Sequence, residues 1–322
     1  MKQEGDVEPV QRDIKLLIVI VVAVFASPVT LVAQDCRIVD LMPAFWQVVS
    51  ETNDAAPEQE IRQFRTKVLA NSDIYSETGF GFHSETELDS AILRGLLAAR
   101  RNPQHVQQMA ALLRTQLPAT IKSFQHAFPD FRCDFPIYLA PSLGKLDGAG
   151  RVIDHHQALA VGVDNVADEY TTTTLPIFLT HELFHRYHFQ VAGFSDDNGD
   201  QEVIWRALWV EGLATYVSMV LNPGTSLQEA LIAPADLVTR AQREVPWLVK
   251  TIAPALDRSE ATIFSEFFEY HQDKGAVPPR AGYYLGARIA QNLASDTSLS
   301  DLAHLQPALA KERVIKTLRS LQ

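Results

Sequence analysis

The stretch that decides this fold is THELFH, residues 180–185, in which His181 and His185 stand four residues apart. Residues at this spacing lie on one face of an α-helix, one turn apart. Both imidazoles can therefore bind a single zinc ion, each through one nitrogen. Glu182 stands beside this pair, where a carboxylate can take a proton from zinc-activated water and pass it to a leaving amine.

The residues around the motif favour a buried helix. The preceding segment LPIFL, residues 175–179, is apolar, and Leu183 and Phe184 project away from the histidine face into the core. A short motif of this kind needs such a context, because it also occurs by chance. The alternative is a pair of histidines that pack inside a helix without a metal.

A catalytic zinc takes three protein ligands and keeps one position open. Glu211 is the strongest candidate for the third ligand. It stands 26 residues after the second histidine, within the apolar segment WVEGLATY, residues 209–216. A buried acid is costly unless it is neutralised or ligated. The small Gly212 and Ala214 are expected to let this helix pack close to the histidine helix. The alternative is a surface pair of Glu211 with Arg206.

Two other sources of a third ligand are weaker. His188 follows three residues after the second histidine on the same helix, so it cannot curl back to complete a tetrahedron. An acidic stretch between the two helices also offers carboxylates, but its pattern is typical of a solvated loop. It contains Asp196, Asp197, Asp200 and Glu202.

HELFH followed by W-x-E-G-x-A-x-Y resembles the gluzincin superfamily of zinc metallopeptidases, and most of all the predicted Zn-dependent proteases among bacterial domains of unknown function. The resemblance covers residues 177–216 and extends more weakly over 136–163 and 280–290. It implies a gluzincin-like fold, an HExxH active-site helix, one zinc ion per chain, and Glu182 as general base. The implied metal ligands are His181, His185 and Glu211.

The chain departs from the gluzincin pattern at one position. Many gluzincins have an Asp four residues after the glutamate ligand, where it orients a zinc-binding histidine. This chain has Thr215 there, so that orienting contact must come from elsewhere.

RAGYYLGA, residues 280–287, resembles the Tyr-x-x-Gly helix start that supplies a tyrosine in gluzincin aminopeptidases. Alignment on Gly286 makes Tyr283 the donor that stabilises the oxyanion of acyl transfer, with Tyr284 as the alternative. The other interpretation is that both are core aromatics. The G-x-M-E-N element of the aminopeptidase branch is absent from the sequence, which favours an endopeptidase.

The remaining pattern predicts an α+β, mainly α fold with a small β-sheet, in a single domain over residues 34–322. Helices are expected within 41–127, with a Ser84–Glu87 capping box, and over 175–191, 202–221, 235–252, 261–271, 282–294 and after 307. Strands are expected at 135–139 and 158–163, joined by a glycine-containing loop. The second strand is a candidate edge strand, to which an extended peptide can add.

Residues 1–33 are predicted to be a signal peptide or an N-terminal membrane anchor. Basic residues precede an apolar run at 16–26 that is too short to span a bilayer by itself. We therefore expect an exported protein, periplasmic or extracellular, with membrane association through this segment if it is retained. The alternative is a buried N-terminal helix. Cys36 and Cys133, the two cysteines, can form a disulfide in an oxidising compartment or remain separate thiols.

The formal net charge of −11 argues against nucleic acid as a partner, because phosphate backbones require clustered Lys and Arg. Together these features predict a zinc-dependent hydrolase that cleaves peptide bonds in a peptide or protein substrate. Two alternatives stay open. One is a non-catalytic envelope protein that binds zinc, and the other is a metallohydrolase that acts on a non-peptide amide.

Overall fold

The computed structural model describes residues 36–70, 72–194, 203–232, 236–269 and 277–321. Within them the chain is mainly helical and contains a mixed four-stranded sheet. The strands are β1 (Ile38–Asp40), β2 (Ile137–Ala140), β3 (Gly148–Ile153) and β4 (His156–Gly162). The longer helices are α1 (Met42–Glu51), α2 (Pro57–Phe64), α3 (Glu85–Arg101), α4 (Pro103–Ala127), α6 (Leu175–Ala192), α7 (Ile204–Leu221), α9 (Leu237–Ile252), α10 (Ala261–Phe268), α11 (Ala281–Leu293) and α13 (Pro307–Ser320). The shorter ones are η1 (Arg65–Leu69), α5 (Val163–Glu169), α8 (Leu227–Leu231), η2 (Ala253–Ala255) and α12 (Leu299–Ala303).

The sheet has the strand order β1-β2-β4-β3, with β1, β2 and β4 parallel and β3 antiparallel to β4. Two sequence expectations were wrong here. The strand predicted at 158–163 is not an edge strand, because β4 lies between β2 and β3. The predicted glycine-containing loop instead contains β3, which is one of the two edge strands of the described sheet, with β1 at the other end. A glycine in β3 allows the strand to lie close to α6, because a Cβ at Gly148 would overlap Phe178 and Glu182 of that helix.

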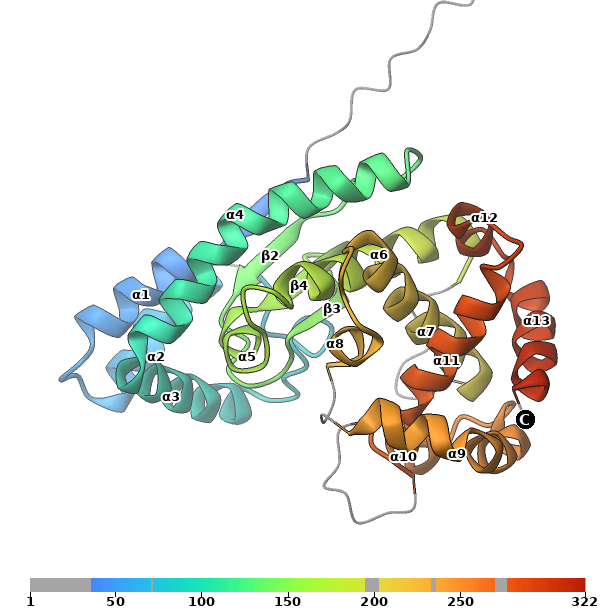
Figure 1. The fold of residues 1–322 in the computed structure, drawn as a ribbon. Helices are drawn as coiled ribbons and strands as arrows, with labels where there is room; N and C mark the ends of the chain where they lie inside the picture. The colour runs from blue at the N-terminus through green and yellow to red at the C-terminus, as the bar shows by residue number, and fades with distance from the viewer. Residues whose placement is uncertain (1–35, 71, 195–202, 233–235, 270–276, 322) are drawn as a thin grey trace, which may run out of the picture. The chain divides into compact units, whose positions relative to one another are not determined.

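Helices α6 and α7 lie side by side at the centre, between the sheet and the C-terminal helices α11 and α13 (Figure 1). Both are buried on almost every side, which explains why their sequences are apolar around most of the helix. A proline at the start of α6 fits the first helical turn, where its missing N–H has no helical partner. Gly193, at φ 71°, ends α6 in the left-handed conformation that glycine adopts most easily.

Helix α7 makes its closest approach to α11 rather than to α6. A Cβ at Gly212 would overlap the backbone of Gly286, and a Cβ at Gly286 would overlap the carbonyl of Leu208. The expectation that Gly212 allows close packing against the histidine helix was therefore wrong. The two glycines set the separation of α7 and α11, and so of Glu211 and Tyr283, which these helices carry.

A disulfide joins Cys36, just before β1, to Cys133, before β2, with the two Cα atoms 5.0 Å apart. It closes a loop across 97 residues that contains α1 to α4. Closing a loop of this length reduces the entropy of the unfolded chain by an amount worth about 4–5 kcal/mol in the simplest entropic model. The open question between a bridge and two separate thiols is resolved in favour of the bridge.

The predicted leader, residues 1–33, lies outside the described residues, so export and membrane anchoring stay predictions. Among the helices that the structure describes, none combines the length and the apolar character needed to cross a bilayer.

The contact between α7 and α11 generates a stability prediction. Gly212→Ala should lower the free energy of unfolding by about 1–3 kcal/mol, because the new methyl group must push two helix backbones apart. Urea titration monitored by circular dichroism measures the change. Gly95→Ala in α3 is the matched control, because a Cβ there meets only the side chain of Leu143, which can move. Equal stability of Gly212→Ala and wild type would contradict this account.

Candidate metal centre

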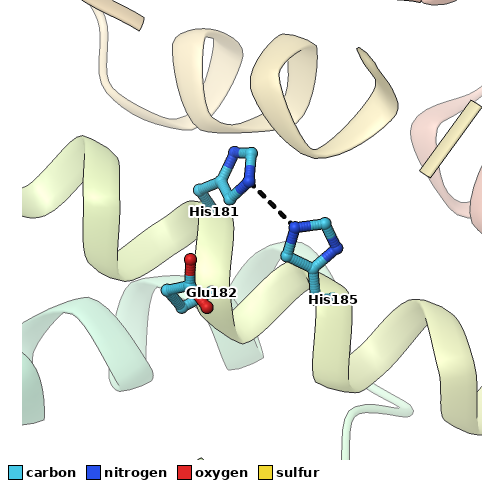
Figure 2. A group of neighbouring side chains, drawn as sticks. All are labelled: His181, Glu182 and His185. Carbon is cyan, nitrogen blue, oxygen red and sulfur yellow. Dashed lines mark hydrogen bonds between the residues drawn. The ribbon is translucent and has the colours of Figure 1, made fainter. Parts of the chain in front are cut away.

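His181 and His185 lie one turn apart on α6 and turn toward each other (Figure 2). Their Nε2 atoms are 2.9 Å apart, and their rings meet edge to face with centroids separated by 4.5 Å. Both side chains are largely buried, with 14% and 13% of their surface exposed. The spacing in the sequence thus produces the shared imidazole face that it predicts.

Glu211 of α7 brings a carboxylate to the same point from the neighbouring helix. Its Oε2 lies 3.3 Å from His181 Nε2 and 3.5 Å from His185 Nε2. Zinc bonds to nitrogen and oxygen are about 2.0–2.1 Å long, so two ligands of a tetrahedral ion lie about 3.3–3.4 Å apart. The three observed separations, 2.9, 3.3 and 3.5 Å, are within a few tenths of this value. The donor set therefore fits one zinc ion with a fourth corner left over.

The charges of these groups are strongly coupled. Burial alone would raise the pKa of Glu211, but the charge of His185 and hydrogen bonds from both histidines hold it well below its usual range. Burial and the neighbouring His185 lower the pKa of His181. An ionised Glu211 carboxylate beside a histidine whose pKa is lowered is a state in which Glu211 and His181 can bind a metal.

Glu182 lies beside the histidine pair rather than between the rings (Figure 2). One of its oxygens is within 4.8 Å of a ligand atom of each histidine, so it is a second carboxylate at this point. Glu211 is the better candidate for a third ligand, because it contacts both Nε2 atoms, whereas Glu182 projects from the adjacent side of α6. Only 8% of Glu182 is exposed, and burial raises its pKa to about 8. A divalent cation nearby would favour its charged form.

Tyr283 of α11 faces the same centre. Its ring centroid is 6.4 Å from that of His181, and its hydroxyl is hydrogen-bonded to Glu211. Burial and the charge of Glu211 raise the pKa of Tyr283 well above its usual value, so the hydroxyl remains a donor. Tyr284, the alternative, is 1% exposed and accepts a hydrogen bond from Arg288 away from the histidines. The structure therefore brings Tyr283, and not Tyr284, to the site.

The two histidines, Glu182, Glu211 and Tyr283 line a cavity of about 310 Å3. One wall is the edge strand with the residue before it, Asp147 to Arg151, and another is formed by α7 and α8. Apolar side chains contribute to the lining, among them Ile177, Phe189, Val210 and Ile232. The candidate metal centre thus lies in a cleft with both polar and apolar walls.

His188 and Thr215, which the sequence analysis also considered, lie outside the cluster of His181, His185 and Glu211. His188 is completely buried among the rings of Phe184, Phe194 and Trp209 and does not line the cavity. Thr215 donates its hydroxyl hydrogen bond to the carbonyl of Glu211 within α7, so it does not orient a histidine.

The predicted alternative, a surface ion pair of Glu211 with Arg206, is not formed. The guanidinium of Arg206 lies instead over the rings of Phe189 and Phe194. The acidic stretch 196–202 lies outside the described residues.

Several cavity residues carried no signal that the sequence analysis could use. Tyr170 donates a hydrogen bond to Asp147 at the start of β3, and Arg151 and Arg280 line the cavity from β3 and from the start of α11. Arginines and tyrosines outside a motif do not differ in sequence from surface residues. Only the left-handed backbone of Arg280, at φ 60°, marks it as unusual, and this is a property of the fold.

Comparisons with protein-family models, with curated proteins and with solved structures gave no match to this chain.

The geometry predicts how the affinity for zinc changes when each of the two carboxylates is replaced by an amide. Glu211→Gln should lower zinc affinity at least about tenfold, because a neutral amide replaces the charged ligand, whereas Glu182→Gln should retain the metal. Competition with a chromophoric chelator measures the affinities, and metal analysis after dialysis gives the stoichiometry. Exposed His155→Ala is the control for loss of an imidazole elsewhere. The reverse order of the two glutamate variants would make Glu182 the ligand.

The burial of His188 and its lowered pKa predict that the stability of the fold depends on pH. Neither ring nitrogen has a hydrogen-bond partner among the described residues, and burial, with His185 and Arg206 nearby, lowers its pKa to about 3. The unfolded chain, with a histidine pKa of about 6.5, binds this proton more readily. Stability should therefore fall as the pH drops from about 6.5 toward 3, by up to about 1.4 kcal/mol per pH unit from this residue.

His188→Phe should remove that contribution while preserving the aromatic packing, so its unfolding free energy should decline less steeply than that of wild type between pH 6.5 and 4. Exposed His126→Phe is the matched control. Urea titrations at several pH values measure both slopes. Parallel slopes for His188→Phe and wild type would show that His188 is not held neutral.

Proposed function

We propose that this chain is a zinc-dependent metallopeptidase of the gluzincin type, which hydrolyses peptide bonds within a peptide or protein substrate. The observation that carries the proposal is the meeting of two imidazoles and the Glu211 carboxylate at zinc-ligand spacing, with a second carboxylate, Glu182, beside them. A purely structural zinc site has four protein ligands and no need of an adjacent carboxylate.

When bound, zinc would supply a Lewis acid at the scissile carbonyl and make a water molecule more acidic. Glu182 is placed to accept the proton of that water and then to deliver it to the leaving amine. Glu182 is buried, which limits the access of bulk solvent to the transferred proton. Tyr283 is placed to donate a hydrogen bond to the oxygen on which negative charge develops.

Strand β3 supports a peptide as the substrate. Within the part of the chain that the structure describes, β4 is its only partner strand, and residues 148–151 line the cavity beside the candidate metal centre. The unpaired edge of a strand can bind an extended peptide through backbone hydrogen bonds. The backbone N–H of Val152 donates to the carbonyl of Thr78, which ends the available edge just beyond Arg151. Gly148 and Gly150 lie against Glu182 and Arg186, so the edge lies close over α6.

The general-base role gives the functional prediction. Glu182→Gln has nearly the same shape but cannot accept the proton, so it should reduce hydrolysis of a casein-type substrate by about 10²–10⁴-fold. The rate of release of labelled fragments is measured with zinc present in excess, and zinc content is measured on the same preparation.

Exposed Glu58→Gln serves as the control for a carboxylate outside the cavity. Equal hydrolysis by Glu182→Gln and wild type would contradict the general-base role. Zinc bound without hydrolysis of any peptide by wild type would favour the non-catalytic zinc protein. Cleavage of N-acyl compounds alone would favour the non-peptide amide hydrolase.

A further inference from the structure

Arg280 is a charged side chain in the cavity that makes no salt bridge with any described carboxylate. It precedes α11, and its guanidinium lies over the ring of Tyr283, 4.4 Å from the centroid. Its Nε is buried and has no hydrogen-bond partner among the described residues. A partly buried charge without a hydrogen-bonded partner is costly.

The backbone of Arg280 adds a second observation. The residue has φ 60° and ψ 20°, a left-handed conformation that glycine or asparagine adopts more easily than arginine. Strain of this kind persists where the surrounding structure requires it, and it concentrates at functional sites. Here the conformation places an arginine at the start of α11, three residues before Tyr283 and beside the metal centre.

The acidic residues around Arg280 leave its guanidinium available to bind a ligand. The acids near it are Glu211, held by the two histidines, Asp147, which accepts a hydrogen bond from Tyr170, and the exposed Glu169, and none of the three forms a salt bridge with its guanidinium. Arg151, from β3, also lines the cavity, and its one hydrogen bond in the described structure goes to the carbonyl of Gly150. The cavity is lined by four arginines and three acids, namely Arg151, Arg186, Arg206, Arg280, Asp147, Glu182 and Glu211.

We propose that Arg280 binds a carboxylate of the substrate and makes the enzyme selective for peptides with an acidic group close to the scissile bond. This inference rests on the proposed peptidase function. Guanidinium and carboxylate form paired, charge-assisted hydrogen bonds, which match the unused donors of Arg280. Its stacking on Tyr283, whose ring adjoins that of His181, puts the carboxylate within about three residues of the bond that is cleaved. The carboxylate comes either from an acidic side chain or from the chain terminus.

The test uses a peptide set in which one glutamine at a time is exchanged for glutamate around a single cleavage site, each with a free or an amidated C-terminus. Wild type, Arg280→Lys and Arg280→Asn are compared for kcat/KM. Asparagine removes the charge but tolerates the left-handed backbone, and lysine keeps a charge without the paired donors. Exposed Arg258→Asn is the matched control, and thermal melting checks that each variant is folded.

Wild type should prefer the best acidic peptide over its neutral partner by about tenfold to a hundredfold, the usual effect of a hydrogen bond to a charged group. Arg280→Asn should lose this preference, measured as the ratio of kcat/KM for the acidic and the neutral peptide, while Arg258→Asn should keep the ratio of wild type. A preference that follows a glutamate assigns the side chain, and one that follows the free C-terminus assigns the terminus. Equal kcat/KM for acidic and neutral peptides in wild type, or a preference unchanged in Arg280→Asn, would overturn the proposal.

A binding measurement separates failure of this inference from failure of the peptidase function. The same peptides are titrated calorimetrically into Glu182→Gln and into the double variant Glu182→Gln, Arg280→Asn, so no hydrolysis is required. Tighter binding of the acidic peptides that disappears in the double variant supports the role of Arg280 even if wild type cleaves none of them. Identical affinities in the two proteins would overturn it even if wild type is an active peptidase.

Discussion

The carboxylate of Glu211 lies within 3.5 Å of two imidazoles in a largely buried cleft, and the surrounding helices hold it there. A charge in this environment would be expelled or neutralised if its partners moved away. The histidines belong to α6 and the carboxylate to α7, so the contact also fixes the register of the two central helices. The requirement to keep these three donors together explains why both helices are enclosed by apolar residues on their other sides.

Close backbone contacts at glycines complete the arrangement around that contact. Gly212 adjoins Glu211 in sequence and meets Gly286 of α11, so α7 and α11 are held at a short separation that also positions Tyr283. On the opposite side Gly148 of β3 lies directly against Glu182. Close packing at glycines thus brings Glu182, Glu211 and Tyr283, the residues to which we assign roles in the proposed function, close to the two histidines.

The local parts of this site could be predicted from the sequence, because a four-residue spacing on a helix determines the relative positions of His181 and His185. Glu211 could also be inferred, since an acid in an apolar helix needs a partner. Helix boundaries such as those of α6 and α13 followed from the apolar pattern and from Pro307. These inferences depend only on interactions within one helix or on the cost of burial.

Long-range features could not be read in the same way. The glycine-rich segment 144–150 resembles a loop, and only pairing with β4 makes part of it an edge strand. Gly212 has the same sequence signal whether it faces α6 or α11. Arg280 begins the stretch RAGYYLGA, but nothing in that stretch predicts that its side chain faces the cavity, because this depends on the left-handed backbone at the start of α11. Each of these depends on contacts between segments that are distant in the chain.

The most direct test of the central claim is a crystal structure of the zinc-loaded protein with data collected on both sides of the zinc absorption edge. The account predicts one anomalous peak within about 2.0–2.2 Å of His181 Nε2, His185 Nε2 and a carboxylate oxygen of Glu211, with Glu182 outside bonding distance. A peak bound by Glu182 in place of Glu211, or no peak at the two histidines, would contradict it.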